Sequence, residues 1–217
     1  MSARRAPLAL VPAAGGPGSE PRLAAQLAED LRTVVERDPS VRSAWEAVLH
    51  PALPAVWGHR VGHRLHRRGH RIAARLLMTL VRSVTGVEIH PGAVLGRRVF
   101  VDHGSGVVVG ETAVVGDDVT LYHQVTLGAV GWWHDNRRAD GERRHPVVGD
   151  RVVLGANATV IGPVTIGADA VVGAQALVVE DVPAGARALA PAVVVGSRQN
   201  GRQAVSLLSH IASAGSW

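Results

Sequence analysis

The stretch from Val148 to Val178 reads VGDRVVLGANATVIGPVTIGADAVVGAQALV and repeats a pattern every six residues. An aliphatic residue stands at each sixth position, a Gly often follows it, and a small or branched residue comes four places later. The same spacing begins at Ile89 and is shifted once, by two places, before Val109. The aliphatic positions are Ile89, Leu95, Val101, Val109, Val115, Leu121, Leu127, Val148, Leu154, Val160, Ile166, Val172 and Val178.

A period of six fits neither an α-helix nor a meander of strands. It predicts a coil with three short faces per turn, in which each face contributes one inward aliphatic residue. A single turn buries these residues only when neighbouring turns stack on it, so the repeats must be numerous. Aromatic residues make up 3% of the chain although 47% is hydrophobic, which suits a narrow aliphatic core. We therefore predict a hexapeptide β-helix over residues 87–195.

Helical patterns precede the coil. Apolar spacing, Pro and Gly predict helices over 20–37, 40–49, 56–67 and 71–85. Asp38 is expected to cap the second helix, with Pro39 at its first position. We predict a short helical domain over residues 22–86, which packs on the coil or on another subunit because its apolar faces need a partner.

The two ends of the chain lack these patterns. Residues 1–21 weakly resemble a secretory signal, but Pro7 and Pro12 interrupt the apolar run, so we expect a disordered leader. Residues 196–217 are expected to form a tail with a short helix over 203–211. The sequence has no Cys, which excludes disulfides and thiolate metal sites, and no apolar run approaches ~18 residues. We expect a cytoplasmic protein.

The basic residues are all Arg, and the net charge is +5. GC-rich coding explains this, and so does attraction for an anionic partner. No nucleic-acid-binding motif is present and aromatic residues are too few for base stacking, so a phosphorylated small molecule is the favoured partner.

Four His residues fall at steps of four, three and four within and just after the third predicted helix: His59, His63, His66 and His70. Such spacing is compatible with metal ligands. Several Arg residues beside them would repel a cation, and no carboxylate shares the face. We expect a solvated or interface face rather than a metal site.

A long loop interrupts the coil between Leu127 and Val148, and about fifteen of its residues protrude beyond an ordinary turn. Long loops on rigid scaffolds often carry function. The loop contains Trp132 and Trp133, which are costly to leave in water. Two interpretations stay open: the rings pack against an adjacent coil, or they form a wall of a substrate pocket.

Polar residues that break the repeat are candidates for chemistry. His103 and Asp102 occupy the two-residue shift, Glu88 and Glu111 lie on the coil, and His145 closes the long loop. An imidazole held by a carboxylate can act as a general base near neutral pH.

The blocks VEIHPGA (87–93), DHGSGVVVGETA (102–113), VTLG (125–128) and RHP (144–146) resemble those of serine O-acetyltransferases. Asp38-Pro39 and HRVGH (59–63) extend the resemblance, which covers about residues 22–197. It implies a mainly β protein, a left-handed parallel β-helix with a short helical domain. It also implies a trimer or a dimer of trimers, with acetyl-CoA between neighbouring coils. The implied activity is acetylation of L-serine to O-acetyl-L-serine in cysteine biosynthesis.

The resemblance also assigns roles by position. The implied catalytic residues are His103 as general base, Glu88 as its partner, His145, and Glu111 as the carboxylate associated with His145. The residues implied to bind serine are Asp38, Asp102 and Arg144, and a zwitterion does need carboxylate for its ammonium and guanidinium for its carboxylate. Those implied to bind acetyl-CoA are Gly128, Ala129, Gly155, Ala156 and Ala174. No metal and no acyl-enzyme are required.

Three departures keep alternatives open. Family members have Gly-Gly-Thr where this sequence has Gly128, Ala129 and Val130, so acetylation of another hydroxy amino acid or a specialised metabolite is the second hypothesis. Glu88 stands where Asp is common. The chain ends in Trp217 rather than in the Ile that docks into O-acetylserine sulfhydrylase, which argues against that partnership.

Two hypotheses from other classes are a catalytically silent scaffold and a γ-carbonic-anhydrase-like metal enzyme. The metal enzyme needs three His on adjacent turns. His90, His103 and His123 are spaced by 13 and 20 residues, which does not fit that pattern.

Overall fold

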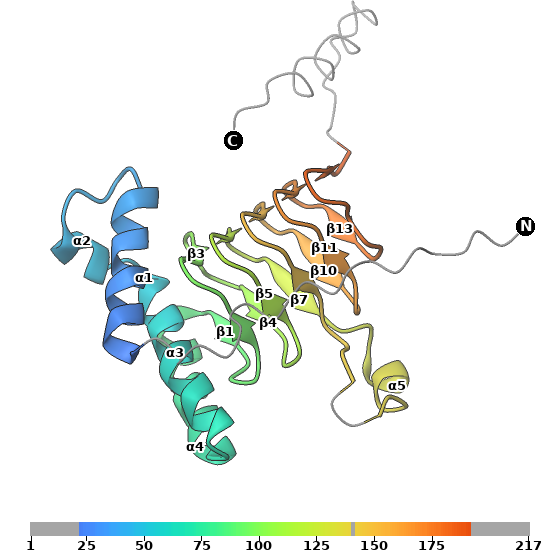
Figure 1. Ribbon diagram of the computed structural model, residues 1–217, viewed down its shortest axis with the longest axis horizontal. Helices are drawn as coiled ribbons and strands as arrows, with labels where there is room; N and C mark the ends of the chain where they lie inside the picture. The colour runs from blue at the N-terminus through green and yellow to red at the C-terminus, as the bar shows by residue number, and fades with distance from the viewer. Residues whose placement is uncertain (1–21, 140–141, 192–217) are drawn as a thin grey trace, which may run out of the picture.

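The structure is a computed structural model and describes residues 22–139 and 142–191. The expected leader, the tail with its helix over 203–211, and Trp217 lie outside the described residues. Four helices sit at one end of a coil of short strands (Figure 1). These helices are α1 (Leu23–Arg37), α2 (Ala44–Val48), α3 (Leu53–Arg67) and α4 (Arg71–Thr85).

The predicted bounds of the second helix are wrong. It begins at Ala44, and its N-cap is Ser43, whose Oγ accepts a hydrogen bond from Glu46 N at 3.2 Å. Asp38 does not cap it, because its carboxylate accepts from the backbone N and the Oγ of Ser40 in a local turn. α3 begins three residues earlier than predicted, with Pro in its first turn. α4 has the predicted bounds and ends at Gly86, whose φ is +70°.

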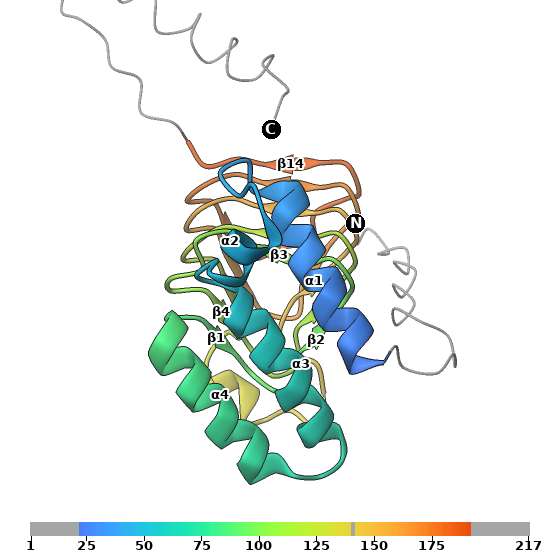
Figure 2. The same ribbon diagram turned by 90° about the vertical axis from the view of Figure 1, so that its left-hand side faces the viewer.

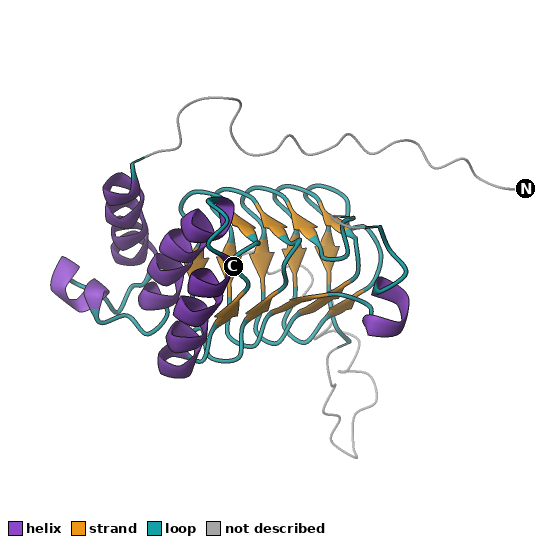
Figure 3. Ribbon diagram, turned by 90° about the horizontal axis from the view of Figure 1, so that it is seen from below, coloured by secondary structure: helices purple, strands orange, loops and turns teal. Residues whose placement is uncertain are grey.

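Three parallel sheets form the sides of the coil (Figure 3), and from β1 to β13 successive strands belong to successive sheets. Sheet A contains β1 (Glu88–Ile89), β4 (Val108–Val109), β7 (Thr126–Gly128), β10 (Thr159–Ile161) and β13 (Leu177–Val178). Sheet B contains β2 (Val94–Leu95), β5 (Val114–Val115), β8 (Val147–Val148) and β11 (Thr165–Ile166). Sheet C contains β3 (Phe100–Val101), β6 (Thr120–Leu121), β9 (Val153–Leu154), β12 (Val171–Val172) and β14 (Arg187–Ala188).

The core is the row of aliphatic residues that the repeat predicts. In sheet A, Ile89 pairs with Val109, Val109 with Leu127 and Leu127 with Val160, so each inward residue stacks on its equivalent one turn away. All thirteen predicted positions except Leu95 are buried, and Leu95 is partly buried against the core. Each buried side chain of this size contributes about 1.5–3 kcal/mol. The prediction of a hexapeptide β-helix is confirmed.

Two of the corners between sheets position the candidate site. The CA corner, where the chain leaves sheet C for sheet A, comprises residues 102–107, 122–125, 155–158 and 173–176. The AB corner, where it leaves sheet A for sheet B, comprises residues 90–93, 110–113, 129–139, 142–146 and 162–164. The strands of sheet A therefore begin at one corner and end at the other. The CA corner contains a residue with φ near +60° in successive turns, namely His103, Gln124, Asn157 and Gln175.

The helices cover the first turn of the coil (Figure 2). α1 contacts β3, while α3 and α4 contact β1 and each other. His59 is fully buried and donates from Nε2 to the carbonyl of Ala93 at 3.1 Å, and His63 lies 2.9 Å from the carbonyl of Pro91. Of the two expected alternatives, a solvated or an interface face, His59 has the interface one, since α3 presents it to the coil. Within the described part of the chain, no helix is long and apolar enough to cross a membrane.

Candidate active site

The CA corner holds a cluster of imidazoles and carboxylates. His103 extends into solvent with 70% of its side chain exposed, and its Nε2 lies 3.7 Å from Oδ1 of Asp102. The His103 and His123 rings meet edge to face, with centroids 5.7 Å apart. The left-handed backbone of His103, at φ +60°, turns this side chain out of the coil. The corner therefore presents an accessible imidazole beside a carboxylate.

The helical layer adds a second carboxylate to this cluster. Asp38 lies in the turn after α1, and its Oδ2 is 3.8 Å from Nε2 of His50. Hydrogen bonds from Ser40 lower the pKa of Asp38, so this carboxylate is ionised at neutral pH. Burial lowers the pKa of His50, whose Nδ1 accepts from the backbone N of Ala52 at 3.3 Å. Sequence reasoning missed His50, which no repeat or motif marks.

The AB corner holds a different set of groups. The guanidinium of Arg144 donates to Glu111 Oε2 at 2.7 Å. Nδ1 of His145 lies 3.1 Å from the backbone N and 2.9 Å from Oγ1 of Thr112. Burial and the neighbouring Arg144 lower the pKa of His145. The structure therefore pairs Glu111 with Arg144 and places Thr112, which sequence reasoning missed, against His145.

α4 borders the same corner with further guanidinium groups. Nη2 of Arg71 lies 3.7 Å from Oε1 of Glu111, and Nη2 of Arg75 lies 3.2 Å from Nε2 of His90. Burial lowers the pKa of His90 to about 4, so it is neutral at physiological pH. The corner thus combines neutral imidazoles with an excess of positive charge.

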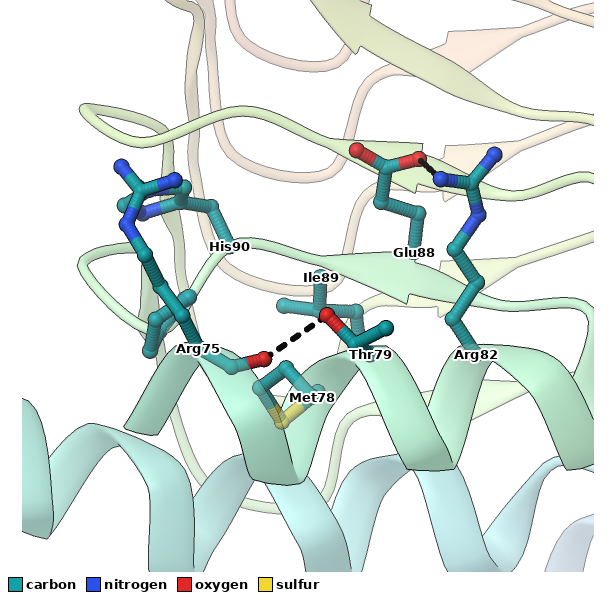
Figure 4. A pocket seen from close by; sticks show the side chains of 8 residues that line it. Arg75, Met78, Thr79, Arg82, Glu88, Ile89 and His90 are labelled. Atoms are coloured by element: carbon teal, nitrogen blue, oxygen red, sulfur yellow. Dashed lines mark hydrogen bonds and ion pairs between the residues drawn. The ribbon is translucent and has the colours of Figure 1, made fainter. Parts of the chain in front are cut away.

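Glu88 points outward from β1 beneath α4, in a small pocket of about 120 Å³ (Figure 4). Its Oε2 lies 3.1 Å from Nη1 of Arg82, and Figure 4 shows the two charged ends meeting. Among the described residues, the structure brings Glu88 to Arg82 and records no contact between Glu88 and His103.

The small residues implied to bind acetyl-CoA are divided between the two corners. Gly128 ends β7, and Ala129 begins the long loop on the AB corner. Gly155, Ala156 and Ala174 stack on the CA corner, where the backbone N of Gln175 donates to the carbonyl of Ala156. A Cβ on Gly155 would overlap the backbone of Ala174, so only Gly permits these turns to approach this closely.

The long loop contains a short helix, α5 (Trp132–Asp135), that the sequence did not predict. The side chain of Asp135 accepts from the backbone N of Gly131 at 3.0 Å and pairs with Arg138 at 3.1 Å. Trp132 and Trp133 meet edge to face at 6.0 Å and are 72% and 59% exposed. The rings therefore do not pack against the coil of their own chain.

The two corners are separate sites within one chain. The step from Val107 to Glu111 along sheet A spans roughly 13 Å at about 3.3 Å per residue. His103 and His123 lie at the CA corner while His90 lies at the AB corner, and the described residues contain no group of His and carboxylates arranged to hold a metal. One chain therefore carries two separate clusters: carboxylates with an exposed imidazole at one corner, and guanidinium with a buried imidazole at the other.

The fold and these clusters are those of a transferase of the hexapeptide-repeat class, and the family model "Bacterial transferase hexapeptide (six repeats)" matches residues 145–179. A serine acetyltransferase of Mycobacterium tuberculosis is 51% identical over 142 residues, which are 65% of this chain and 59% of that protein. The serine acetyltransferase of Helicobacter pylori is 46% identical over 66% of this chain and 80% of that protein. The chain thus spans less than two thirds of the Mycobacterium tuberculosis relative.

A soybean serine acetyltransferase solved in complex with serine superposes with a TM-score of 0.72 at 40% identity, covering 80% of this chain and 69% of that chain. The chain belongs to the serine acetyltransferase family. Its coil is accordingly the left-handed parallel β-helix of that family.

Proposed function

We propose that the protein transfers the acetyl group of acetyl-CoA to the hydroxyl of L-serine, which yields O-acetyl-L-serine and CoA. One observation supports the proposal: the chain carries two complementary clusters at opposite ends of the sheet A strands, and each is proposed to be half of an active site. Neither half suffices, because a base without a carboxylate-binding guanidinium cannot orient a zwitterionic amino acid.

The complete site is proposed to form between subunits. A cyclic assembly brings the CA corner of one coil against the AB corner of the next, and the arrangement closes after three subunits. Acetyl-CoA would lie in the same groove, beside Gly155, Ala156 and Ala174 of one coil and Gly128 and Ala129 of its neighbour. We propose a trimer, alone or paired as a dimer of trimers, in the cytoplasm.

Charge complementarity gives the serine-binding roles. Asp38 and Asp102 would bind the ammonium group of serine, and Arg144 would bind its carboxylate. Arg144 is held by Glu111 at 2.7 Å and is still partly exposed, so its remaining N–H groups are available to a ligand. The hydroxyl of serine is then directed toward His103.

His103 is proposed as the general base. Its imidazole takes the hydroxyl proton while the serine oxygen attacks the thioester carbonyl carbon. The tetrahedral intermediate collapses, the C–S bond breaks, and the CoA sulfur leaves and takes up a proton. Glu88 is proposed to orient His103. The Glu88 carboxylate must then leave Arg82 and accept a hydrogen bond from the His103 imidazole when the site assembles.

A second candidate function rests on the long loop. Val130, Trp132 and Trp133 are exposed apolar side chains on the strip that follows Gly128 and Ala129. If they line the acceptor side of the assembled groove, the enzyme acetylates a bulkier hydroxy amino acid in preference to serine.

Release of CoA distinguishes these functions. Free thiol is measured with acetyl-CoA and L-serine, L-threonine, L-homoserine or no acceptor, and the product is identified by mass spectrometry. The proposal expects the highest kcat/KM with L-serine. A preference for a larger acceptor supports the second candidate, and no thiol release with any acceptor contradicts both.

A further inference from the structure

Thr112 contacts His145 and the backbone that leads into it through four hydrogen bonds, although 33 residues separate the two in sequence. Its backbone N and its Oγ1 approach Nδ1 of His145 at 3.1 and 2.9 Å. Its Oγ1 also accepts from the backbone N of Arg144 at 3.0 Å and of His145 at 3.1 Å. Thr112 therefore holds both the imidazole of His145 and the backbone of Arg144 and His145, at the point where the long loop rejoins the coil.

The backbone contact determines the tautomer of His145. A peptide N–H can only donate, so the Nδ1 atom that it meets must carry a lone pair. A neutral imidazole with an unprotonated Nδ1 bears its proton on Nε2. An imidazolium would set an Nδ1–H against the N–H of Thr112, so this contact also disfavours the charged ring.

The imidazole of His145 is closely packed against Gly110. His145 is only 7% exposed, and a Cβ at Gly110 would overlap the Cδ2 and Nε2 atoms of the imidazole. Gly110 thus leaves the space in which the Nε2 edge lies, and the described residues provide no hydrogen-bond partner for Nε2. The charged groups facing the ring are Arg144, Glu111 and Asp135.

We propose that Thr112 is a positioning residue that holds His145 as the neutral Nε2–H tautomer, so that His145 donates a hydrogen bond to the thioester carbonyl oxygen and is not a second general base. The inference rests on the proposed function and extends it by giving His103 and His145 different roles in the reaction. His103 removes the hydroxyl proton, and Nε2–H of His145 stabilises negative charge on the carbonyl oxygen as the C–O bond forms. His145 neither gains nor loses a proton in this step.

The tautomer is measured directly by two-bond ¹⁵N–¹H correlation on histidine-labelled protein at pH 7. The His145 signals are assigned as those missing from His145→Gln. The proposal expects an Nε2–H tautomer in the unliganded protein, a measurement that does not depend on which acceptor the enzyme uses. An Nδ1–H tautomer or an imidazolium at pH 7 overturns it even if serine acetylation is confirmed.

Variants test whether Thr112 acts through His145. Thr112→Val keeps the backbone N–H but removes the hydroxyl, and should lower kcat roughly 5- to 10-fold, the worth of about one hydrogen bond. Thr112→Ser should restore kcat, and Thr159→Val, on the outer face of β10, should leave it unchanged. Thr112→Val should leave the acid limb of the kcat/KM profile where it is, because Thr112 does not contact His103, the proposed base.

Gly110→Ala provides an independent test if Thr112→Val folds poorly. The added methyl displaces the imidazole without changing any polar group, so it should lower kcat and shift the Nε2 signal of His145 while the KM for acetyl-CoA stays near its original value. A normal kcat in Gly110→Ala, together with a normal kcat in Thr112→Val, contradicts the positioning role.

Discussion

Arg60 on α3 and Asp30 on α1 form an ion pair, with Nη2 and Oδ1 3.0 Å apart and side chains only 5% and 2% exposed. The same guanidinium donates to the carbonyl oxygens of Leu95 and Gly96 at 2.8 Å. Burial raises the pKa of Asp30 while the Arg60 hydrogen bonds oppose that shift. Two helices and the first turn of the coil thus meet at one charged residue, and Asp38, in the turn that follows α1, depends on that packing.

Asp30→Asn should destabilise the protein by about 3–5 kcal/mol, because removing one partner leaves the other charge buried and uncompensated. Unfolding in urea, at fixed protein concentration, measures the change. Asp169→Asn is the matched control, since its pair with Arg151 is exposed and should contribute little. Equal midpoints for Asp30→Asn and the parent protein would contradict a structural role for this pair.

Acid should destabilise the fold through its buried His residues. Burial lowers the pKa of His59 from 6.5 to about 3, and its Nδ1 has no hydrogen-bond partner among the described residues. Above pH 6.5 the ring is neutral in both states. Below pH 6.5, His59 binds a proton in the unfolded chain but stays neutral in the folded chain. The free energy of unfolding therefore falls as the pH drops toward 3.

His59→Gln should flatten this dependence, because an amide can donate to Ala93 but does not titrate. Urea unfolding at pH 7 and pH 5 should show the parent losing about 2 kcal/mol more than the variant, from ~1.4 kcal/mol per pKa unit. His70→Gln, at an exposed position, is the control. Parallel losses in the parent and in His59→Gln would show that His59 is protonated in the folded state.

The repeat was predictable from sequence because every turn buries the same positions, so the period reports the packing directly. The start of the second helix was not predictable. Asp38 and Pro39 match the residues that begin a helix, but the Asp38 side chain accepts a hydrogen bond from Ser40 in a local turn instead. The contacts of the site were not predictable either. Thr112 reaches His145 only because the corners of successive turns stack, and that adjacency has no signature in local spacing.

His103→Ala should lower kcat by about 10²–10⁴-fold, the usual contribution of a positioned general base. The fold should survive, since the side chain is exposed at the CA corner and lies outside the aliphatic core. Steady-state thiol release measures the change, with the melting temperature as the check on folding. Near-normal turnover would exclude His103 as the base.

Substitution of the tandem Trp residues tests whether the long loop forms a wall of the substrate pocket or only packs against a neighbouring coil. Trp132→Ala or Trp133→Ala should change the ratio of kcat/KM among acceptors or acyl donors by roughly tenfold, as loss of 1–3 kcal/mol of apolar contact predicts. The melting temperature should hold, because both rings are exposed on their own chain. If the ratios stay constant while the melting temperature or the trimer weakens, the loop packs against a neighbouring coil instead.

The shared site is tested most directly by mixing two inactive subunits. His103→Ala loses the CA half-site and His145→Ala loses the AB half-site, so neither homotrimer should turn over at an appreciable rate. In trimers assembled from equal amounts of both by co-expression, a site is intact when an intact CA corner meets an intact AB corner. Random cyclic assembly gives about one quarter of the sites this arrangement. We predict recovery of about a quarter of the parent rate of CoA release with L-serine, and no recovery above the two separate variants would contradict a site formed between subunits.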